Sequence, residues 1–298
     1  MNHYTVYGNT IATDLLFPQL IPCIAQTADI VIRQGVIPDH ILAEAEHSAY
    51  AFGSSESYLV NKTCYLYVEN GRTITYRTKP GANENYLKTY ILGYGIAMLF
   101  LQMGQLAIHC SAVSDAKGAI LICGESGCGK STVTTHLLER GYTLMADDMA
   151  VLAHNKEGKA MVMPAFPYQK LCRDVVEQQK LDQSRLLYIN EEKDKFLVPY
   201  QGSFFTHPVL LRGIILLSLS VRENDVLCRP LTGIDTFHAY TENLFLRHLL
   251  AEKKYQVPVG PLCLSFANAV PIWNITRPVQ KDTLTKVLSC VDHIAASL

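Results

Sequence analysis

The chain has 298 residues, 49% of them hydrophobic and 18% charged, which is typical of a globular protein with one large domain or two ordinary ones. Its 26 basic and 27 acidic residues give a net charge of −1, and this balance argues against an electrostatic nucleic-acid binder. Nine cysteines without a C-x-x-C pair leave no zinc or redox signature and favour reduced thiols in a cytoplasmic protein.

The opening residues, Met1-Asn-His-Tyr-Thr-Val-Tyr7, have neither the basic start nor the apolar stretch of a signal peptide. The longest uncharged apolar segment, residues 90–110, contains Gly, Gln and His. It is predicted to be a core helix followed by a strand, since a membrane span needs about 20 mostly apolar residues. We therefore expect no membrane partner.

Residues 1–84 are predicted to form a small, mostly β domain. Within it, residues 63–68 and 73–77 flank Asn70-Gly71, a dipeptide that supplies the two positive-φ positions of a type I′ hairpin turn. Residues 29–33 are predicted to be another short strand, and residues 79–84 a linker.

Residues 85–298 are predicted to form a second, α/β domain. Apolar residues recur at intervals of three and four over 85–103 and predict a helix there. Residues 181–192 are polar and predicted to be helical or irregular. The remaining predicted elements are strands at 106–113, 119–123, 143–146, 150–153, 212–220 and 269–275, and helices at 131–140, 236–252 and 281–296.

The segment Gly124-Glu-Ser-Gly-Cys-Gly129-Lys130-Ser131 fits the phosphate-binding loop pattern G-x-x-x-x-G-K-[ST] between a predicted strand and a predicted helix. Glycines let the loop N–H groups turn toward phosphate oxygens, and the helix N-terminus adds a positive dipole. Lys130 is expected at the β/γ-phosphates and the Ser131 hydroxyl on Mg²⁺. The predicted nucleotide-binding residues of this segment are Gly124, Ser126, Gly127, Cys128, Gly129, Lys130, Ser131 and Thr132.

Two adjacent acids, Asp147 and Asp148, follow a predicted strand only sixteen positions after Ser131. In a nucleotide site one such carboxylate can hold Mg²⁺ while its neighbour accepts a proton from an attacking hydroxyl. The alternative is a solvated Asp-Asp turn. His109 lies one strand before the loop, where a lone histidine is most often a satisfied core residue.

Two basic residues are further candidates for binding phosphate. Lys195 could reach a phosphate from a loop or belong to a solvated charged loop. Arg212 could be an anion ligand at a strand end or a plain surface anchor, and the sequence does not choose between these readings.

Three segments in order, residues 108–113, 124–131 and 140–148, resemble the kinase core of the HPr kinase/phosphorylase family. The resemblance implies a phosphate-loop kinase fold shared with phosphoenolpyruvate carboxykinase, with ATP and Mg²⁺ as cofactors and a serine hydroxyl of a carrier protein as acceptor. It also implies that His109 helps to position phosphate, that Asp147 is the general base, and that Asp148 lies nearer the metal. Because relatives in this family assemble as oligomers, the resemblance also implies that this protein could form a homo-oligomer.

Residues 7–20, 164–171 and 193–195 resemble a divergent branch, the HPr-kinase-like proteins. Some members of that branch phosphorylate a serine, commonly the last residue, of a lasso-peptide precursor. Leu210 stands where HPr kinases carry a metal-associated Glu before an Arg-Gly pair, which argues against phosphorylase activity and against HPr itself as substrate.

The sequence thus predicts a Mg-ATP-dependent kinase that phosphorylates a peptide serine, the C-terminal serine of a lasso-peptide precursor, with Asp147, His109 and Lys130 as catalytic residues and Ser131 and Asp148 at the metal. Three alternatives stay open: a kinase of another protein or of a small-molecule hydroxyl, an ATPase or GTPase switch without a phosphoacceptor, and a nucleotide sensor without turnover. No Asn-Lys-x-Asp motif is present, which argues against a GTPase.

Overall fold

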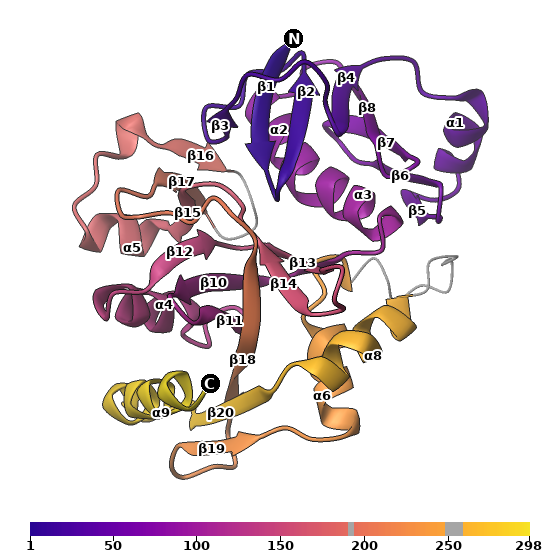
Figure 1. Ribbon diagram of the computed structural model, residues 1–298. Coiled ribbons are helices and arrows are strands. Elements are labelled where there is room, and N and C mark those ends of the chain that lie inside the picture. The colour runs from indigo at the N-terminus through magenta and orange to yellow at the C-terminus, as the bar shows by residue number, and fades with distance from the viewer. Residues whose placement is uncertain (190–193, 248–258) are drawn as a thin grey trace. The chain divides into compact units, whose positions relative to one another are not determined.

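The computed structural model describes residues 1–189, 194–247 and 259–298, and it confirms a mixed α/β protein (Figure 1). The chain divides into two compact units. One contains Met1–Gln105 and Phe166–Gln201, and the other contains Leu106–Ala165, Gly202–Arg247 and Val259–Leu298. The predicted boundary near residue 84 lies within the first unit. The chain leaves this unit at Gln105, passes through part of the second unit, and re-enters the first unit at Phe166.

The first unit is built on an eight-stranded mixed sheet with the order β3-β1-β2-β4-β8-β7-β6-β5. Asn70 and Gly71 have φ values of 55° and 58°, which confirms the predicted tight turn between β7 and β8. The strands are β1 (Asn2–Val6), β2 (Asn9–Thr13), β3 (Ile21–Pro22), β4 (Ile30–Gln34), β5 (Tyr50–Phe52), β6 (Glu56–Val60), β7 (Cys64–Glu69) and β8 (Thr73–Thr78).

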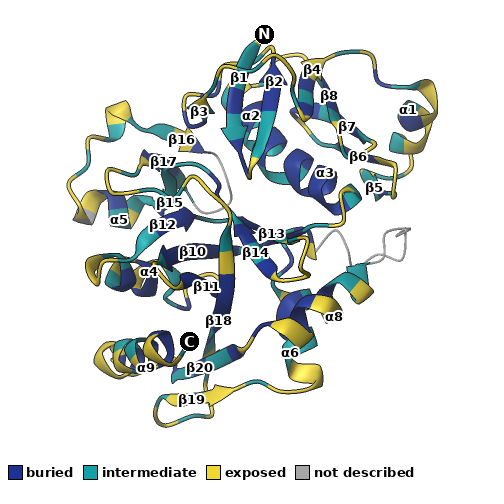
Figure 2. Cartoon of the chain, viewed as in Figure 1, coloured by how far each residue is buried: buried dark blue, intermediate teal, exposed yellow. Residues whose placement is uncertain are grey.

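The predicted helix over residues 85–103 is confirmed as α2 (Glu84–Tyr90) and α3 (Ile96–Gln102), joined by a π-helical turn, η1 (Ile91–Gly95). Six successive residues of α3, Ile96 to Leu101, are buried, and this helix is largely in the buried colour in Figure 2. The Gln102 amide then closes the helix onto the hairpin, since Nε2 donates to the Val68 carbonyl at 3.1 Å and Oε1 accepts the Gly71 N–H at 2.8 Å. This packing places both helices with the first unit. A further short helix, α1 (Asp39–Ala45), belongs to the same unit.

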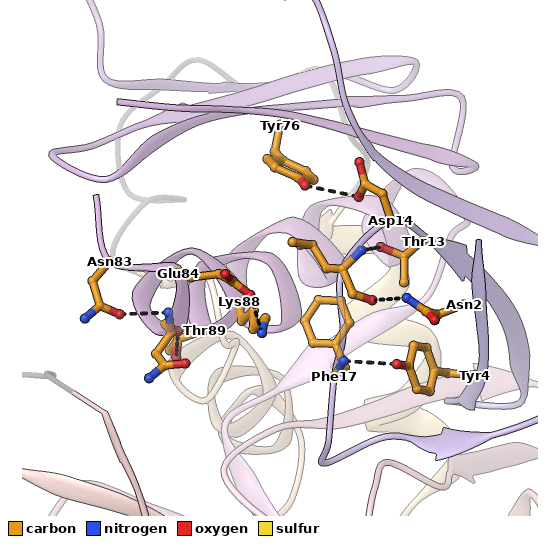
Figure 3. Close-up of polar contacts among 12 residues, drawn as sticks. Asn2, Tyr4, Thr13, Asp14, Phe17, Tyr76, Asn83, Glu84, Lys88 and Thr89 are labelled. Carbon is orange, nitrogen blue, oxygen red and sulfur yellow. Dashed lines mark hydrogen bonds and ion pairs between the residues drawn. The ribbon is translucent and has the colours of Figure 1, made fainter. Parts of the chain in front are cut away.

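Side-chain hydrogen bonds hold the opening segment onto this sheet (Figure 3). The Asp14 carboxylate accepts the Tyr76 hydroxyl at 3.1 Å and the Gln34 N–H at 2.8 Å. Burial, together with the nearby Asp14 charge, raises the pKa of Tyr76 well above its usual value. The buried ammonium of Lys88 pairs with Glu84 at 2.6 Å, one helical turn earlier on α2.

A separate three-stranded sheet of the first unit has the order β15-β17-β16. A small apolar cluster of Leu171, Val176, Phe196 and Val198 holds it together. The predicted polar segment 181–192 contains a 3₁₀ turn and a strand up to residue 189, and its last residues lie outside the described range. The elements are β15 (Tyr168–Cys172), α5 (Arg173–Gln178), η2 (Gln183–Arg185), β16 (Leu187–Ile189) and β17 (Lys195–Pro199).

The second unit is built on a nine-stranded sheet in which β11 and β20 flank β18 in parallel. All seven residues of β11 are buried. The strands are β9 (Leu106–Ile108), β10 (Cys110–Asp115), β11 (Gly118–Gly124), β12 (Thr143–Ala146), β13 (Ala150–His154), β14 (Ala160–Met163), β18 (Val209–Ser220), β19 (Leu227–Pro230) and β20 (Ile272–Pro278). The helices are α4 (Lys130–Glu139), α6 (Ile234–Glu242), α8 (Val259–Ala269) and α9 (Leu284–Ser297).

Two predicted elements of this unit differ from the structure because of long-range pairing. The predicted strand 106–113 is interrupted at His109, between β9 and β10. The predicted helix 236–252 ends at Glu242, since the following residues pair with the His109 segment, and residues 248–252 lie outside the described range. Within the described residues, no helix combines the length and apolar character needed to cross a membrane, and all nine cysteines are free thiols.

Arg212 anchors the start of β18 in the core of the second unit. Its Nη1 donates to both Asp115 carboxylate oxygens at 2.8 and 3.0 Å, and its Nη2 donates to the Ala295 carbonyl in α9 at 3.0 Å. The residue is only 8% exposed, so it is a buried anchor rather than a surface one.

We expect Arg212→Met to lower the free energy of unfolding at pH 7 by about 2–3 kcal/mol, below the upper range for buried pairs because the Asp115 side chain is 26% exposed. Burial raises the pKa of Asp115, but the Lys117 N–H and the Arg212 guanidinium outweigh it and hold that pKa below its usual value. The stabilisation is therefore present above about pH 4 and lost as pH falls through the lowered pKa.

Urea unfolding at pH 7 and near pH 3 measures this effect, with the exposed Arg222→Met as control. The gap between Arg212→Met and the wild type should narrow at the lower pH. An equal gap at both pH values would show that the charge pair is not its source.

Candidate nucleotide-binding site

The phosphate loop connects the end of β11 to the start of α4, which confirms the predicted strand, loop and helix. Gly124 has a φ of 133°, and a Cβ there would lie 2.3 Å from the Leu217 carbonyl oxygen. Only glycine fits this position. Gly127 and Gly129 have φ values of 82° and 109°, with no atom within 4 Å of a Cβ, so the backbone conformation alone requires glycine there.

The Lys130 side chain lies back over its own loop. Its Nζ donates to the Gly124 carbonyl at 2.6 Å and to the Glu125 carbonyl at 3.1 Å. Ser126, Gly127, Ser131 and Thr132 are exposed, so a ligand can reach the loop at these predicted contacts.

Cys128 is different, because its side chain is buried under the loop. Burial raises the pKa of this thiol despite the nearby Lys130 charge, so Cys128 is a neutral thiol that packs rather than a nucleophile.

The register of three strands brings His109, the loop and the two acids to one sheet edge. β10 is antiparallel to β11 with Cys110 opposite Cys123, so His109 and Gly124 follow at the same end. β12 is antiparallel to β10 with Ala112 opposite Ala146, which places Asp147 at that end too. Three segments that the sequence singled out are thus neighbours within one compact unit.

Each of the two acids has a defined partner at this edge. The buried Ser111 hydroxyl donates to Asp147 Oδ1 at 2.7 Å and fixes that carboxylate. Asp148 has a φ of 71°, a left-handed backbone that is uncommon outside glycine and that concentrates at functional sites. The Asp148 carboxylate lies beside the His109 ring.

His109 and Asp148 contact each other twice. Nδ1 of His109 lies 3.0 Å from the Asp148 carbonyl oxygen and 3.7 Å from Oδ1. Because a carbonyl oxygen only accepts, this nitrogen carries a proton, and in a neutral ring the lone pair is then on Nε2. The Asp148 side chain is 12% exposed, so this acid is not in a solvated turn. The His109 side chain is 37% exposed, so it is not fully buried in the core.

Two residues that sequence reasoning missed contact the loop from far along the chain. The Arg277 guanidinium donates from Nε to the Cys128 carbonyl at 3.3 Å and from Nη2 to the Gly127 carbonyl at 3.4 Å. The Asn243 side chain accepts the Gly124 N–H at 3.1 Å. No local sequence signal marks either residue, since both contacts depend on tertiary structure more than a hundred positions away.

Arg212 and Leu210 are not brought to the loop. Along the parallel pair β11 and β18, Ala119 is opposite Leu211 whereas Gly124 is opposite Leu217. At about 3.3 Å per residue, Arg212 lies roughly 17 Å of strand away from the loop end. Its place is therefore that of a structural anchor, and a residue at position 210 lies still further along the strand from this chain's own loop.

Lys195 lies in β17 of the first unit, where its backbone is opposite Cys172 and Ile189. It belongs to a strand rather than to the predicted loop. Its contact with phosphate stays a prediction.

No known family profile matches the chain. The chain is 29% identical over 146 residues to the HPr kinase/phosphorylase of Thermoanaerobacter sp. (strain X514), an alignment that covers 49% of this chain and 37% of that protein. It is 40% identical over 57 residues to the HPr kinase/phosphorylase of Pelodictyon phaeoclathratiforme (strain DSM 5477 / BU-1), covering 19% of this chain and 17% of that protein.

Among solved structures, an alignment with the Hpr(Ser) kinase/phosphatase from Coxiella burnetii covers 64% of this chain and 97% of that one, at 14% identity and a TM-score of 0.32. That score does not establish a shared overall fold. The two sequence alignments cover only 37% and 17% of the length of the curated relatives. The sequence matches support distant homology between part of this chain and the HPr kinase/phosphorylases.

Proposed function

We propose that this protein is a Mg-ATP-dependent kinase that transfers the γ-phosphate to a serine hydroxyl. The observation that carries the proposal is the meeting of the phosphate loop with Asp147, Asp148 and His109 at one edge of the second unit's sheet. Distant homology to HPr kinase/phosphorylases supports the same reaction class. The core would then be of the HPr kinase and phosphoenolpyruvate carboxykinase type.

The residues at the loop fit a nucleotide carrying Mg²⁺. No group of three His, Cys, Asp or Glu side chains forms a metal site in the described part of the chain. Mg²⁺ does not need one, because it keeps several waters and takes phosphate oxygens with one or two protein oxygens. The Ser131 hydroxyl and the Asp148 carboxylate would hold the ion, which would neutralise charge on the phosphates.

The chain's own residues would then do the rest of the chemistry. The loop N–H groups and the Lys130 ammonium would bind the phosphate oxygens, and Asp147 would orient the acceptor hydroxyl and take its proton. The hydroxyl oxygen forms a bond to the γ-phosphorus as the bond from that phosphorus to the β–γ bridging oxygen breaks, and ADP leaves. Ser111 would keep the Asp147 carboxylate aimed, while the 37% exposed His109 ring would contact transferred phosphate.

For the acceptor, we propose a peptide serine, with the C-terminal serine of a lasso-peptide precursor as first choice. Its support is the resemblance of residues 7–20, 164–171 and 193–195 to the branch that includes such kinases. The mostly β part of the first unit, residues 1–84, would recognise the peptide. Its eight strands lie between residues 2 and 78. Nine free thiols support a reducing, cytoplasmic setting.

The test is transfer of label from γ-labelled Mg-ATP by the full chain to four acceptors: a precursor-like peptide ending in serine, the same peptide ending in alanine, HPr, and water. Label on the serine peptide alone is the expected result. Label on HPr would support the proposed kinase activity but show that the acceptor is HPr rather than the peptide. Release of labelled phosphate without labelled peptide or protein would favour the ATPase alternative, and absence of any turnover would contradict the proposed function.

A further inference from the structure

Asn243 lies at the point where α6 ends and the chain turns to pair with the His109 segment. Its carbonyl accepts the His109 N–H at 2.8 Å, and two residues later the Phe245 N–H donates to the Ala107 carbonyl at 2.9 Å. The short segment after α6 thus forms an antiparallel bridge beside Ala107 to His109, with Ile108 opposite Leu244. The Phe245 ring also lies against the His109 ring, with centroids 6.3 Å apart.

The side chain of the same residue reaches the phosphate loop. Asn243 Oδ1 accepts the Gly124 N–H at 3.1 Å, while Nδ2 donates to the Ala239 carbonyl in the last turn of α6 at 2.8 Å. The two bonds fix which end of the amide faces the loop, since an N–H needs an acceptor and a carbonyl needs a donor. An amide side chain meets both needs at once.

Both polar backbone groups of Gly124 are therefore bound, one in each of the two peptide groups that flank its Cα. Its N–H is bound by Asn243 and its carbonyl by the Lys130 ammonium, at 3.1 and 2.6 Å. The Gly124 backbone also passes close to β18, since a Cβ at this position would lie 2.3 Å from the Leu217 carbonyl oxygen. A shift of Gly124 would therefore disturb its contacts with both Asn243 and Lys130.

We propose that Asn243 is a positioning residue, which holds the phosphate loop at a fixed position relative to the His109–Asp148 pair. The inference rests on the proposed function, because this relative position matters for transfer between phosphate held by the loop and groups held beside His109. One backbone carbonyl and one side-chain amide of a single residue bind the two segments. Misplacement of reacting groups by about 1 Å can cost about 100-fold in rate.

The experiment compares Asn243→Ala and Asn243→Asp with Asn155→Ala as matched control. Asn155 caps the β13–β14 turn by accepting the Glu157 and Lys159 N–H groups, away from the loop. The backbone bond from His109 survives every substitution at 243, so the variants remove only the side-chain tie. Asp keeps the acceptor for Gly124 and loses the donor to Ala239.

We expect Asn243→Ala to lower kcat for phosphoryl transfer about 10–100-fold, with Asn155→Ala within twofold of the wild type at the same folded fraction. Asn243→Asp should lose as much thermal stability as the Ala variant but recover kcat to within about fivefold of the wild type. That split separates positioning from a merely structural role, because stability and turnover then move independently. A kcat within twofold for Asn243→Ala, or equal losses for Ala and Asp, would overturn the inference.

If the wild type shows no turnover, the proposed function fails and the inference is judged by Mg-ATP affinity instead. A Kd raised about tenfold in Asn243→Ala and restored in Asn243→Asp supports the tie between residue 243 and the loop. An unchanged Kd in both variants contradicts it.

Discussion

Asp147→Asn should lower kcat for phosphoryl transfer by about 10²–10⁴-fold, the range attributed to a general base, while Mg-ATP affinity stays within about threefold. The amide keeps the oxygen that accepts the Ser111 hydroxyl at 2.7 Å, so the local structure should persist. It cannot take a proton from the acceptor. Single-turnover transfer at saturating Mg-ATP, combined with calorimetric measurement of nucleotide binding, separates the chemical step from binding.

The matched control for this acid is Asp292→Asn. Asp292 pairs with Arg140 at 2.6 Å and with His136 at 2.9 Å, and these contacts tie α9 to the far end of α4. This variant removes a carboxylate from the same unit without touching the loop. Equal kcat for Asp147→Asn and the wild type would show that another group accepts the proton.

Lys130→Met is the second change with a large expected effect, a loss of about 10²–10³-fold in kcat/KM, as for removal of one donor to transition-state charge. Methionine keeps most of the side-chain length but has no ammonium for the phosphates or for the Gly124 carbonyl. Nucleotide should also stabilise the variant less. Mg-ATP at 100 times the Kd stabilises a protein by about 2.7 kcal/mol, and most of this should disappear at the same nucleotide concentration.

Thermal unfolding with and without Mg-ATP measures this loss, beside the initial rate of transfer. Lys117→Met, which removes an exposed lysine from the β10–β11 turn, is the matched control and should behave as the wild type does. Full nucleotide stabilisation of Lys130→Met would mean that the Lys130 ammonium does not contribute to phosphate binding.

The parts of the site that follow local rules could be predicted from the sequence. The phosphate loop is a short motif whose glycines are required by backbone geometry, and the strand ending before Asp147 is short and apolar. The Asn70-Gly71 turn is specified by its own two residues in the same way. In each case the interactions that determine the structure lie within a few positions.

Other parts depend on partners that are distant in the sequence. The roles of Asn243 and Arg277 arise from contacts with residues more than a hundred positions away. Strands β1 and β2 have no clear alternation, and they exist because each pairs with neighbours in the eight-stranded sheet. The role of Arg212 could not be predicted either, because it depends on its contacts with Asp115 and with the Ala295 carbonyl, both distant in the sequence.

The two compact units are interleaved along the chain, and this limits how the protein can be divided. Removing residues 1–84 would strip away the whole eight-stranded sheet but leave α3, whose residues from Ile96 to Leu101 are buried, without its packing partner. Removing everything up to Gln105 would still leave Phe166–Gln201 behind. Neither unit is a cassette that a gene fusion could exchange, so acceptor preference is expected to change by substitution within an intact chain rather than by domain shuffling.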